Sequence, residues 1–156
     1  MKLSLTAFLA VAATAVLAGS ASASPARSAS LQIQHERVGC HSWALNGGTP
    51  GVAQKLTLAR GGTVSILNND LMPHRLVQLS GKKISFVNLK GAMGAMGMHI
   101  ATVAGNMTYM GAGTKLVFPS AGTYTFITKA GEDYPAAGNV KTVGEDHVLK
   151  LTVVVN

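Results

Sequence analysis

The stretch GTVSILNNDLMPH, residues 62–74, begins as an alternating strand and ends in a turn that presents a histidine. Aliphatic and β-branched residues alternate with small polar ones from residue 63 to residue 67, which predicts a half-buried β-strand. The following Asn-Asn-Asp triplet predicts a turn, because Asn and Asp side chains hydrogen-bond to nearby backbone groups. Pro73 has a fixed φ and biases the residue before it towards extended geometry, so it helps to aim His74 from a rigid turn.

Similar short runs occur on both sides of this stretch. They are separated by Gly, Pro and Asn, and no segment after residue 23 shows a helical apolar stripe. Such spacing is typical of an all-β sandwich or barrel. The strands that we expect span residues 55–59, 63–67, 74–79, 83–89, 114–118, 123–128 and 148–155, with a further strand near residues 38–43. Two connections are long, 91–113 and 130–146, and loops of this length in a compact domain are usually functional or mobile.

The start of the chain predicts export. Residues 1–23 combine Lys2, an apolar run and the small-residue pattern Ala21-Ser22-Ala23, which is typical of a cleaved signal peptide. The apolar run is too short for a membrane span of roughly 20 residues, and no cysteine follows it to carry a lipid anchor. We therefore expect a periplasmic or secreted protein without stable membrane insertion after cleavage. The expected organisation is a signal peptide over residues 1–23, a flexible lead over 24–34 and one domain over 35–156.

The charge balance excludes several classes of function. The chain carries 13 Lys and Arg against 6 Asp and Glu, but the basic residues are scattered rather than gathered with aromatics. A nucleic-acid-binding face needs a concentrated basic patch, so we expect no nucleic-acid partner. The charge favours solubility, with docking to acidic partners as a second option. No nucleophile elbow, phosphate-binding loop or HExxH motif is present, so we do not expect an enzyme.

Residues 62–74 resemble the first ligand motif of the cupredoxins, in which a strand runs through an Asn-rich turn into Pro-His. Residues 121–126 resemble the strand before the cupredoxin ligand loop, and residues 149–155 resemble the closing strand. The resemblance extends over residues 38–155. It implies a Greek-key β-sandwich and a copper site in which His74 is a ligand.

The ligand loop departs from the blue-copper pattern. In blue-copper members of that family, a cysteine follows the Gly-x-Tyr-x-Phe-x strand, and a histidine and often a methionine come a few residues later. Here Thr128 stands at the cysteine position, and no histidine or methionine follows until His147. A blue site needs two histidines and a thiolate, so the usual loop cannot build one here.

The pair Cys40-His41 offers another thiolate and another imidazole. Cys40 is the single cysteine of the chain, and a lone thiol in an exported protein is more typical of a metal ligand, a reactive group or an intermolecular bridge than of filler. A thiolate with one or two histidines suits copper or zinc. Adjacent strand residues point to opposite faces, so both can bind one ion only if the backbone turns, which Gly39 permits. The alternative is a buried cysteine that packs as a small apolar residue.

The connection after residue 90 is rich in soft ligands. Thioethers are neutral and select Cu(I) over hard cations. No leucine occurs from residue 91 to residue 115, whereas apolar filler would ordinarily use leucine as often as methionine. The candidate ligands of this segment are Met93, Met96, Met98 and His99, followed by Met107 and Met110. Glu132 lies where the usual ligand loop would be, so its carboxylate could replace a lost ligand, although a solvated acidic tip is the simpler interpretation.

Taken together, these features predict an exported copper-binding protein for copper capture, buffering or delivery. Cys40 and His74 would form the nucleus of the site, completed by His41, a methionine of the loop or Glu132. A protein that exchanges copper or electrons with it is the expected partner. The alternatives are an electron carrier with an atypical copper site and a metal-free binding module.

Overall fold

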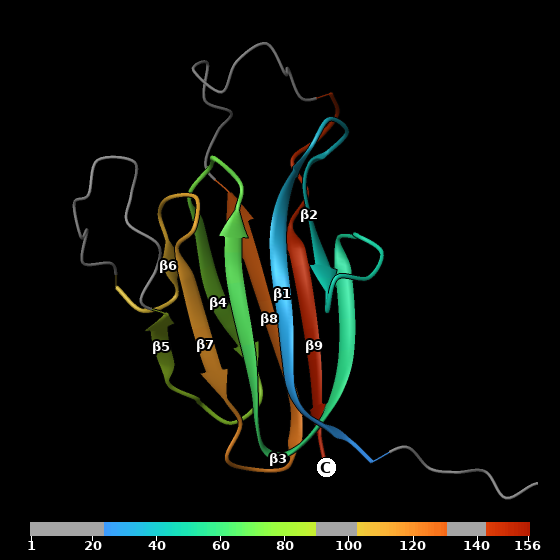
Figure 1. The fold of residues 1–156 in the computed structure, drawn as a ribbon, viewed down its shortest axis with the longest axis vertical. Helices are drawn as coiled ribbons and strands as arrows, with labels where there is room; N and C mark the ends of the chain where they lie inside the picture. Colours follow the sequence, from blue (N-terminus) through green and yellow to red (C-terminus); the bar gives the residue numbers. More distant parts are fainter. Residues whose placement is uncertain (1–23, 90–102, 131–142) are drawn as a thin grey trace, which may run out of the picture.

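The computed structural model describes residues 24–89, 103–130 and 143–156, and it is built from β-strands throughout (Figure 1). The described residues contain no helix, so none is long and apolar enough to cross a membrane. The predicted all-β class is therefore confirmed. The strands are β1 (Ala26–Glu36), β2 (Cys40–Leu45), β3 (Ala53–Asn69), β4 (His74–Ser80), β5 (Phe86–Leu89), β6 (Asn106–Met107), β7 (Gly113–Val117), β8 (Gly122–Ala130) and β9 (Leu149–Val155).

The long strand β3 belongs to both layers of a sandwich. Residues 53–58 pair in parallel with β9, whereas residues 63–69 lie between β1, which is parallel, and β7, which is antiparallel. Gly61 has a φ of +77° at the bend, and its N–H donates to the carbonyl of Phe118 over 2.8 Å. The turn predicted at residues 60–62 is thus a bend within one continuous strand.

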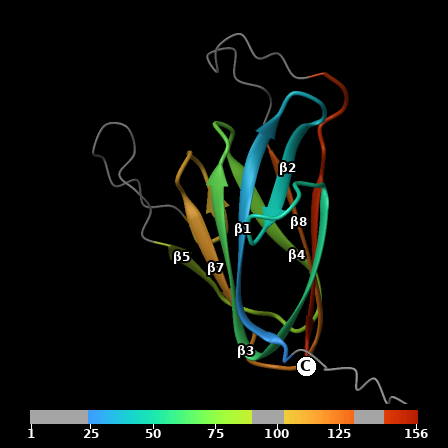
Figure 2. The ribbon, with the colours of Figure 1, turned by 45° about the vertical axis from the view of Figure 1, so that its right-hand side comes forward.

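The two layers follow from this bend. One contains β2, β1, the second half of β3, β7 and β5, and the other contains the first half of β3, β9, β8, β4 and β6 (Figure 2). Period-2 alternation turns one face of each strand inward, as β9 shows: its buried residues alternate with exposed or half-buried ones. The fully buried residues between the layers include Leu31, Ile33, Leu58, Ile66, Leu116, Phe118, Phe126, Leu151 and Val153.

The predicted flexible lead over residues 24–34 is wrong for most of its length. Ala26–Glu36 forms β1, which lies between β2 and β3 and buries Leu31 and Ile33 completely. Small and polar residues flank these two, so the local pattern is weak. The strand is stabilised by parallel pairing with β3, a partner remote in sequence, which local periodicity does not reveal.

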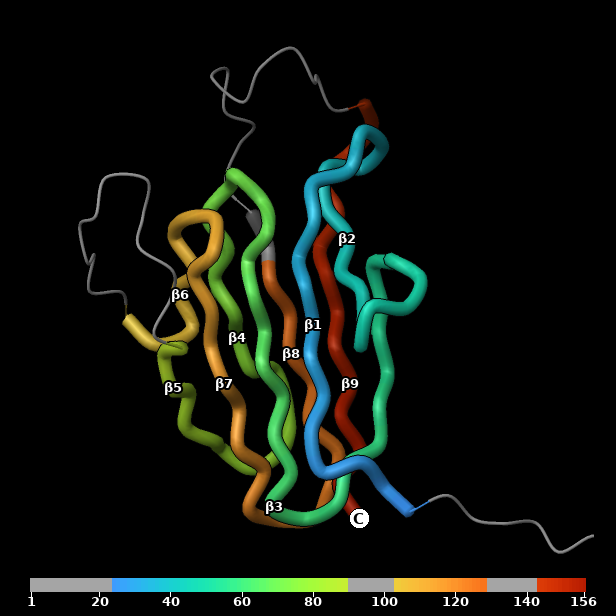
Figure 3. The backbone as a smooth tube through the Cα atoms, in the orientation of Figure 1, coloured from blue at the N-terminus to red at the C-terminus, as the bar shows by residue number. Residues whose placement is uncertain are grey.

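One end of the sandwich brings the predicted ligands together. The turn between β1 and β2 and the turn between β3 and β4 both lie at the upper end in Figures 1 and 3. The segment before β9 joins them, because the N–H of His147 donates to the carbonyl of Gly39 over 3.0 Å. The sandwich thus sets three chain segments side by side at this end.

Candidate metal centre

The turn between β1 and β2 holds Cys40 in an unusual backbone conformation. Gly39 and Cys40 have φ values of +75° and +65°. A non-glycine residue in the left-handed region costs about 1–2 kcal/mol. Strain of this kind gathers at functional sites, where the surrounding structure enforces it. The backbone thus turns at Gly39, which is the condition under which Cys40 and His41 could bind one ion.

Gly39 also leaves room for a neighbouring imidazole. A Cβ atom at this position would overlap the imidazole ring of His147. The Nδ1 atom of His147 in turn lies 3.2 Å from the carbonyl oxygen of His41. His147 therefore packs closely on the turn that carries Cys40 and His41.

The turn between β3 and β4 is held by side-chain hydrogen bonds. The buried amide of Asn68 donates to the carbonyls of Met72 and Met107 over 2.8 and 3.1 Å, and its oxygen accepts the N–H of Asp70 over 2.9 Å. The Oδ1 atom of Asp70 accepts the N–H of Met72 over 3.1 Å. The turn predicted from the Asn-Asn-Asp triplet is present, and it fixes the direction of His74.

Asp70 is the centre of the side-chain cluster at this end. Its Oδ2 atom lies 2.7 Å from Nδ1 of His41 and 3.2 Å from Nε2 of His74, and its Oδ1 atom lies 3.3 Å from Nδ1 of His35. The side chains of Asp70, His41 and His74 are fully buried, whereas that of His35 is 23% exposed. One carboxylate thus contacts imidazoles from β1, β2 and β4.

The contacts keep Asp70 ionised. Burial by itself raises the pKa of a carboxyl group, but hydrogen bonds from His41, His74 and the N–H of Met72 outweigh it and hold the pKa of Asp70 well below its usual range. A negative charge therefore lies inside this end of the sandwich. Such a charge needs compensation by bound protons or by a cation.

Two sulfur atoms lie beside the imidazoles. Sγ of Cys40 is 3.5 Å from Sδ of Met72, and both residues are buried. Donor atoms of His35, Cys40 and His41 all lie within 4.8 Å of one another, and so do those of His41, Asp70 and His74. His41 belongs to both groups, whereas Cys40 and His74 do not share one, so two donor groups adjoin at His41.

The buried nitrogens of this cluster indicate a missing partner. Nε2 of His35, Nε2 of His41 and Nδ1 of His74 are buried and have no hydrogen-bond partner among the described residues. Buried polar atoms are almost always satisfied. Nε2 of His41 does lie 3.3 Å from Oδ1 of Asp146, but the two are not aligned for a hydrogen bond. Imidazole, thiolate and thioether donors together suit copper, and we conclude that the residues present fit a copper ion.

The remaining predicted ligands divide into two groups. Met93, Met96, Met98, His99 and Glu132 lie outside the described residues, so their prediction stays untested. Met107 is fully buried in the hydrophobic core opposite His74 on β6, and Met110 is 47% exposed. Thr128, at the cysteine position of the blue-copper pattern, is buried on β8 and its hydroxyl has no partner among the described residues.

Sequence reasoning missed three residues of the cluster. His35 was given no role from the sequence, but it pairs with His41 in the register of β1 and β2. Asp70 was considered only as a turn former and Met72 only as the residue before proline. Asp70 precedes His74 by four residues, and this spacing within one turn was the signal that could have found it.

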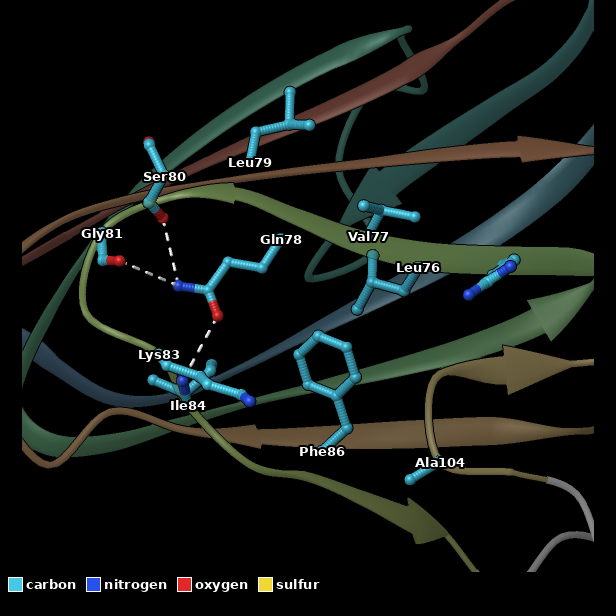
Figure 4. A pocket seen from close by; sticks show the side chains of 11 residues that line it. Leu76, Val77, Gln78, Leu79, Ser80, Gly81, Lys83, Ile84, Phe86 and Ala104 are labelled. Carbon is cyan, nitrogen blue, oxygen red and sulfur yellow. Dashed lines mark hydrogen bonds between the residues drawn. The ribbon is translucent and has the colours of Figure 1, made fainter.

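A surface pocket reaches the cluster. Its volume is about 430 Å³, and its lining includes Glu36, Arg37, His41 and His147. A larger cavity of about 580 Å³ lies along β4 and the segment before β5 (Figure 4). Among the residues that the structure describes, its lining contains no His, Cys, Met or carboxylate. The side-chain amide of Gln78 accepts a hydrogen bond from the N–H of Ile84 and donates one to the carbonyl of Ser80. The described lining of the larger cavity therefore offers no imidazole, sulfur or carboxylate donor to a metal.

Comparison with known proteins gives similarities in structure only. No family model matches the chain, and no curated protein matches its sequence. Among solved structures, amicyanin from Paracoccus versutus is 18% identical, with 86% of each chain covered and a TM-score of 0.39. The inclusion body protein PixA from Burkholderia cenocepacia is 12% identical over 86% of this chain and 98% of that one, with a TM-score of 0.41. The McoA multicopper oxidase from Aquifex aeolicus is 15% identical over 84% of this chain and 29% of that one, with a TM-score of 0.40. At these identities and TM-scores the case for a metal rests on the side chains described above.

Proposed function

We propose that this chain is an exported copper-binding protein that captures, buffers or delivers copper and acts as a carrier rather than an enzyme. The observation that carries the proposal is the donor cluster at one end of the sandwich. There, three histidines each keep one buried nitrogen without a hydrogen-bond partner among the described residues, and the sulfur atoms of Cys40 and Met72 lie nearby. Copper, when bound, would supply a positive charge close to Asp70 and a partner for the imidazole nitrogens.

The charges of the cluster support a copper ion. Asp70 carries one negative charge in a buried region, and Cys40, which is also buried, would add a second one as a thiolate when it binds the ion. With neutral imidazoles, Cu(II) would balance these charges, and Cu(I) would leave a single negative charge. The two sulfur donors favour Cu(I), because soft ligands select the softer oxidation state.

The pocket at His41 supports exchange of the ion with a partner. His41 is fully buried against bulk solvent, yet it contributes to the lining of the pocket beside Glu36 and His147. Copper delivery needs such a route, since a ligand of the partner must reach the ion before the donor protein releases it. The expected partner is a metal-transfer protein.

Electron transfer is the second candidate, and the rigidity of the donors favours it. His74 is held by the Asn68 turn, and Cys40 by the strained turn before β2. A site that changes oxidation state rapidly needs donors that move little between the two states. A copper-loaded protein with an intense charge-transfer band and fast electron self-exchange would favour this function over delivery.

The test of copper binding is titration with Cu(I) against a competing chelator and with Cu(II) by visible absorption. We expect one tight Cu(I) site, and we expect Cys40→Ser and His74→Ala each to weaken Cu(I) binding by about 100-fold or more. That loss corresponds to about 2.7 kcal/mol or more. Full copper affinity in both variants would contradict the proposal. If neither copper ion bound the unaltered protein, the metal-free binding module would be the better interpretation.

Export is tested separately. Cell fractionation and N-terminal sequencing should show a processed chain outside the cytoplasm that begins near Ser24. A cytoplasmic chain with an intact N-terminus would contradict this part of the proposal.

A further inference from the structure

The larger cavity, which lies along β4, shares none of its lining residues with the two donor groups of the metal centre. Consecutive residues from Arg75 to Gly81 line it on one side. At about 3.3 Å per strand residue, this run is roughly 20 Å long. The cavity is therefore an elongated groove beside a strand, a shape that suits an extended chain.

The edge of β4 that faces this groove has little strand beside it. β8 pairs with β4 along its length, whereas the pairing of β6 with β4 ends at Arg75. The N–H of Leu76 still donates to the carbonyl of Gly105 over 2.8 Å, so the backbone groups of Leu76 point away from β8. Because these directions alternate along an antiparallel strand, the N–H and carbonyl of Gln78 point the same way. No strand among the described residues pairs with Gln78 on that side.

Apolar side chains from both layers of the sandwich form the floor of the groove. Leu76 of β4 and Ile84 are buried, and Phe86 at the start of β5 is half-buried. Figure 4 shows Leu76 and Phe86 directed towards each other from the two layers. With a volume of about 580 Å³, the groove has room for apolar side chains of a bound chain.

The charged residues of the groove are all cations. Arg75 lies at one end of the β4 run, and Lys83 follows the turn at its other end, and both are exposed. The acidic side chains among the described residues are Glu36, Asp70, Glu145 and Asp146, and none of them lines the groove. A chain bound there meets positive charge that no neighbouring carboxylate of the groove neutralises.

We propose that the open edge of β4 binds an extended acidic peptide of a partner protein by strand addition. The peptide backbone pairs with Gln78, its alternate apolar side chains enter the groove, and its carboxylates lie near Arg75 and Lys83. A second copy of this chain is a poor occupant, because it carries 13 Lys and Arg against 6 Asp and Glu and would bring like charges together. The inference goes beyond copper binding and does not depend on it.

The test uses two synthetic peptides with blocked ends, one that alternates leucine with aspartate and one that alternates leucine with lysine. We expect the acidic peptide to bind and to slow amide hydrogen exchange at Gln78, measured by NMR, because this N–H gains an acceptor. The amide of Val77, which points towards β8, should not change. No binding of the acidic peptide, equal binding of both peptides, or binding without protection of Gln78 would overturn the proposal. Protection of Gln78 that rises with protein concentration in the absence of peptide would assign the edge to a second copy, and would overturn it too.

Lys83→Glu and Lys55→Glu provide matched variants. Both reverse the charge of an exposed lysine, but Lys55 lies on β3 and does not line the groove. We expect Lys83→Glu to weaken binding of the acidic peptide by about three- to tenfold. Lys55→Glu should weaken it by less than about twofold. Equal losses in the two variants would overturn the proposal, and unchanged Cu(I) affinity in both would show that such a failure leaves the copper function standing.

Discussion

At the scale of single residues, Asp70 determines both the stability and the chemistry of the donor cluster. Asp70 is fully buried and ionised, and it is hydrogen-bonded by the rings of His41 and His74 and by the N–H of Met72. A buried anion is unfavourable unless it is hydrogen-bonded on all sides. The residues that stabilise Asp70 are therefore the same residues that provide the imidazoles.

The first prediction concerns the stability of Asp70→Asn without metal. We expect the free energy of unfolding at neutral pH to fall by about 2–3 kcal/mol, because hydrogen bonds to a charged group are lost. The folded-state pKa of Asp70 is lowered, so its stabilisation is complete above the unfolded-state pKa of about 3.9. The stabilisation is lost as the pH falls through the lower folded-state pKa.

Urea unfolding over a pH series measures this effect. The difference between the wild type and Asp70→Asn should narrow as the pH falls below about 4. Glu36→Gln serves as the control, because Glu36 accepts a hydrogen bond from Ser42 and not from the cluster. A difference that stayed constant down to strongly acidic pH would mean that the charge of Asp70 is not the cause.

The second prediction separates the metal-binding role of a methionine from its packing role. Met72 is buried beside Cys40, whereas Met110 is 47% exposed. Replacement of Met72 by Leu should cost less than about 1.5 kcal/mol of stability, because the volume is conserved. Cu(I) affinity should nevertheless fall about tenfold, equivalent to about 1.4 kcal/mol. Met110→Leu should bind Cu(I) as the wild type does, and equal affinities for all three proteins would exclude the Met72 thioether as a ligand.

At the scale of elements, the strands defined by a local alternating pattern could be predicted from the sequence. A strand that is ordered by pairing with a distant part of the chain could not. The strands β4, β8 and β9 follow from alternation over their own residues. β1 does not, because the parallel partner that orders it is β3. The same division applies to the site: His74 and the Cys40-His41 pair were identified by their chemistry, whereas the role of His35 depends on the register of β1 against β2.

The third prediction concerns the turn between β1 and β2. Gly39→Ala places a Cβ in the left-handed region and against the ring of His147, whereas Gly47→Ala meets the same backbone strain at φ +70° with no atom within 4 Å. We expect Gly47→Ala to lower the free energy of unfolding by about 1–2 kcal/mol and Gly39→Ala to lower it by more. The difference between the two losses of unfolding free energy measures how closely His147 packs against Gly39.

Chemical denaturation of both variants measures this difference, and Cu(I) titration shows its effect on the site. Gly39→Ala should weaken Cu(I) binding, because the backbone that carries Cys40 and His41 must move. Gly47→Ala should not. Equal destabilisation of the two variants would show that His147 is not held against the turn.

At the scale of the whole molecule, the donors join the two layers of the sandwich. β1 and β2 belong to one layer, β4 belongs to the other, and the turn after β3 passes between them at the same end. An ion bound to the group of His41, Asp70 and His74 would link β2, the turn after β3 and β4. Binding should therefore stabilise the whole fold and not one loop alone.

The fourth prediction follows from this linkage. A ligand that binds only the folded state stabilises it by about 2.7 kcal/mol when its free concentration is 100 times its Kd. For a domain of this size, that corresponds to an increase in Tm of roughly 6–12 °C. Scanning calorimetry with Cu(I) under anaerobic buffer should show such an increase in one cooperative transition. His74→Ala, which removes a donor between the layers, should show a much smaller increase at the same copper concentration, and an equal increase in both proteins would place the copper elsewhere in the molecule.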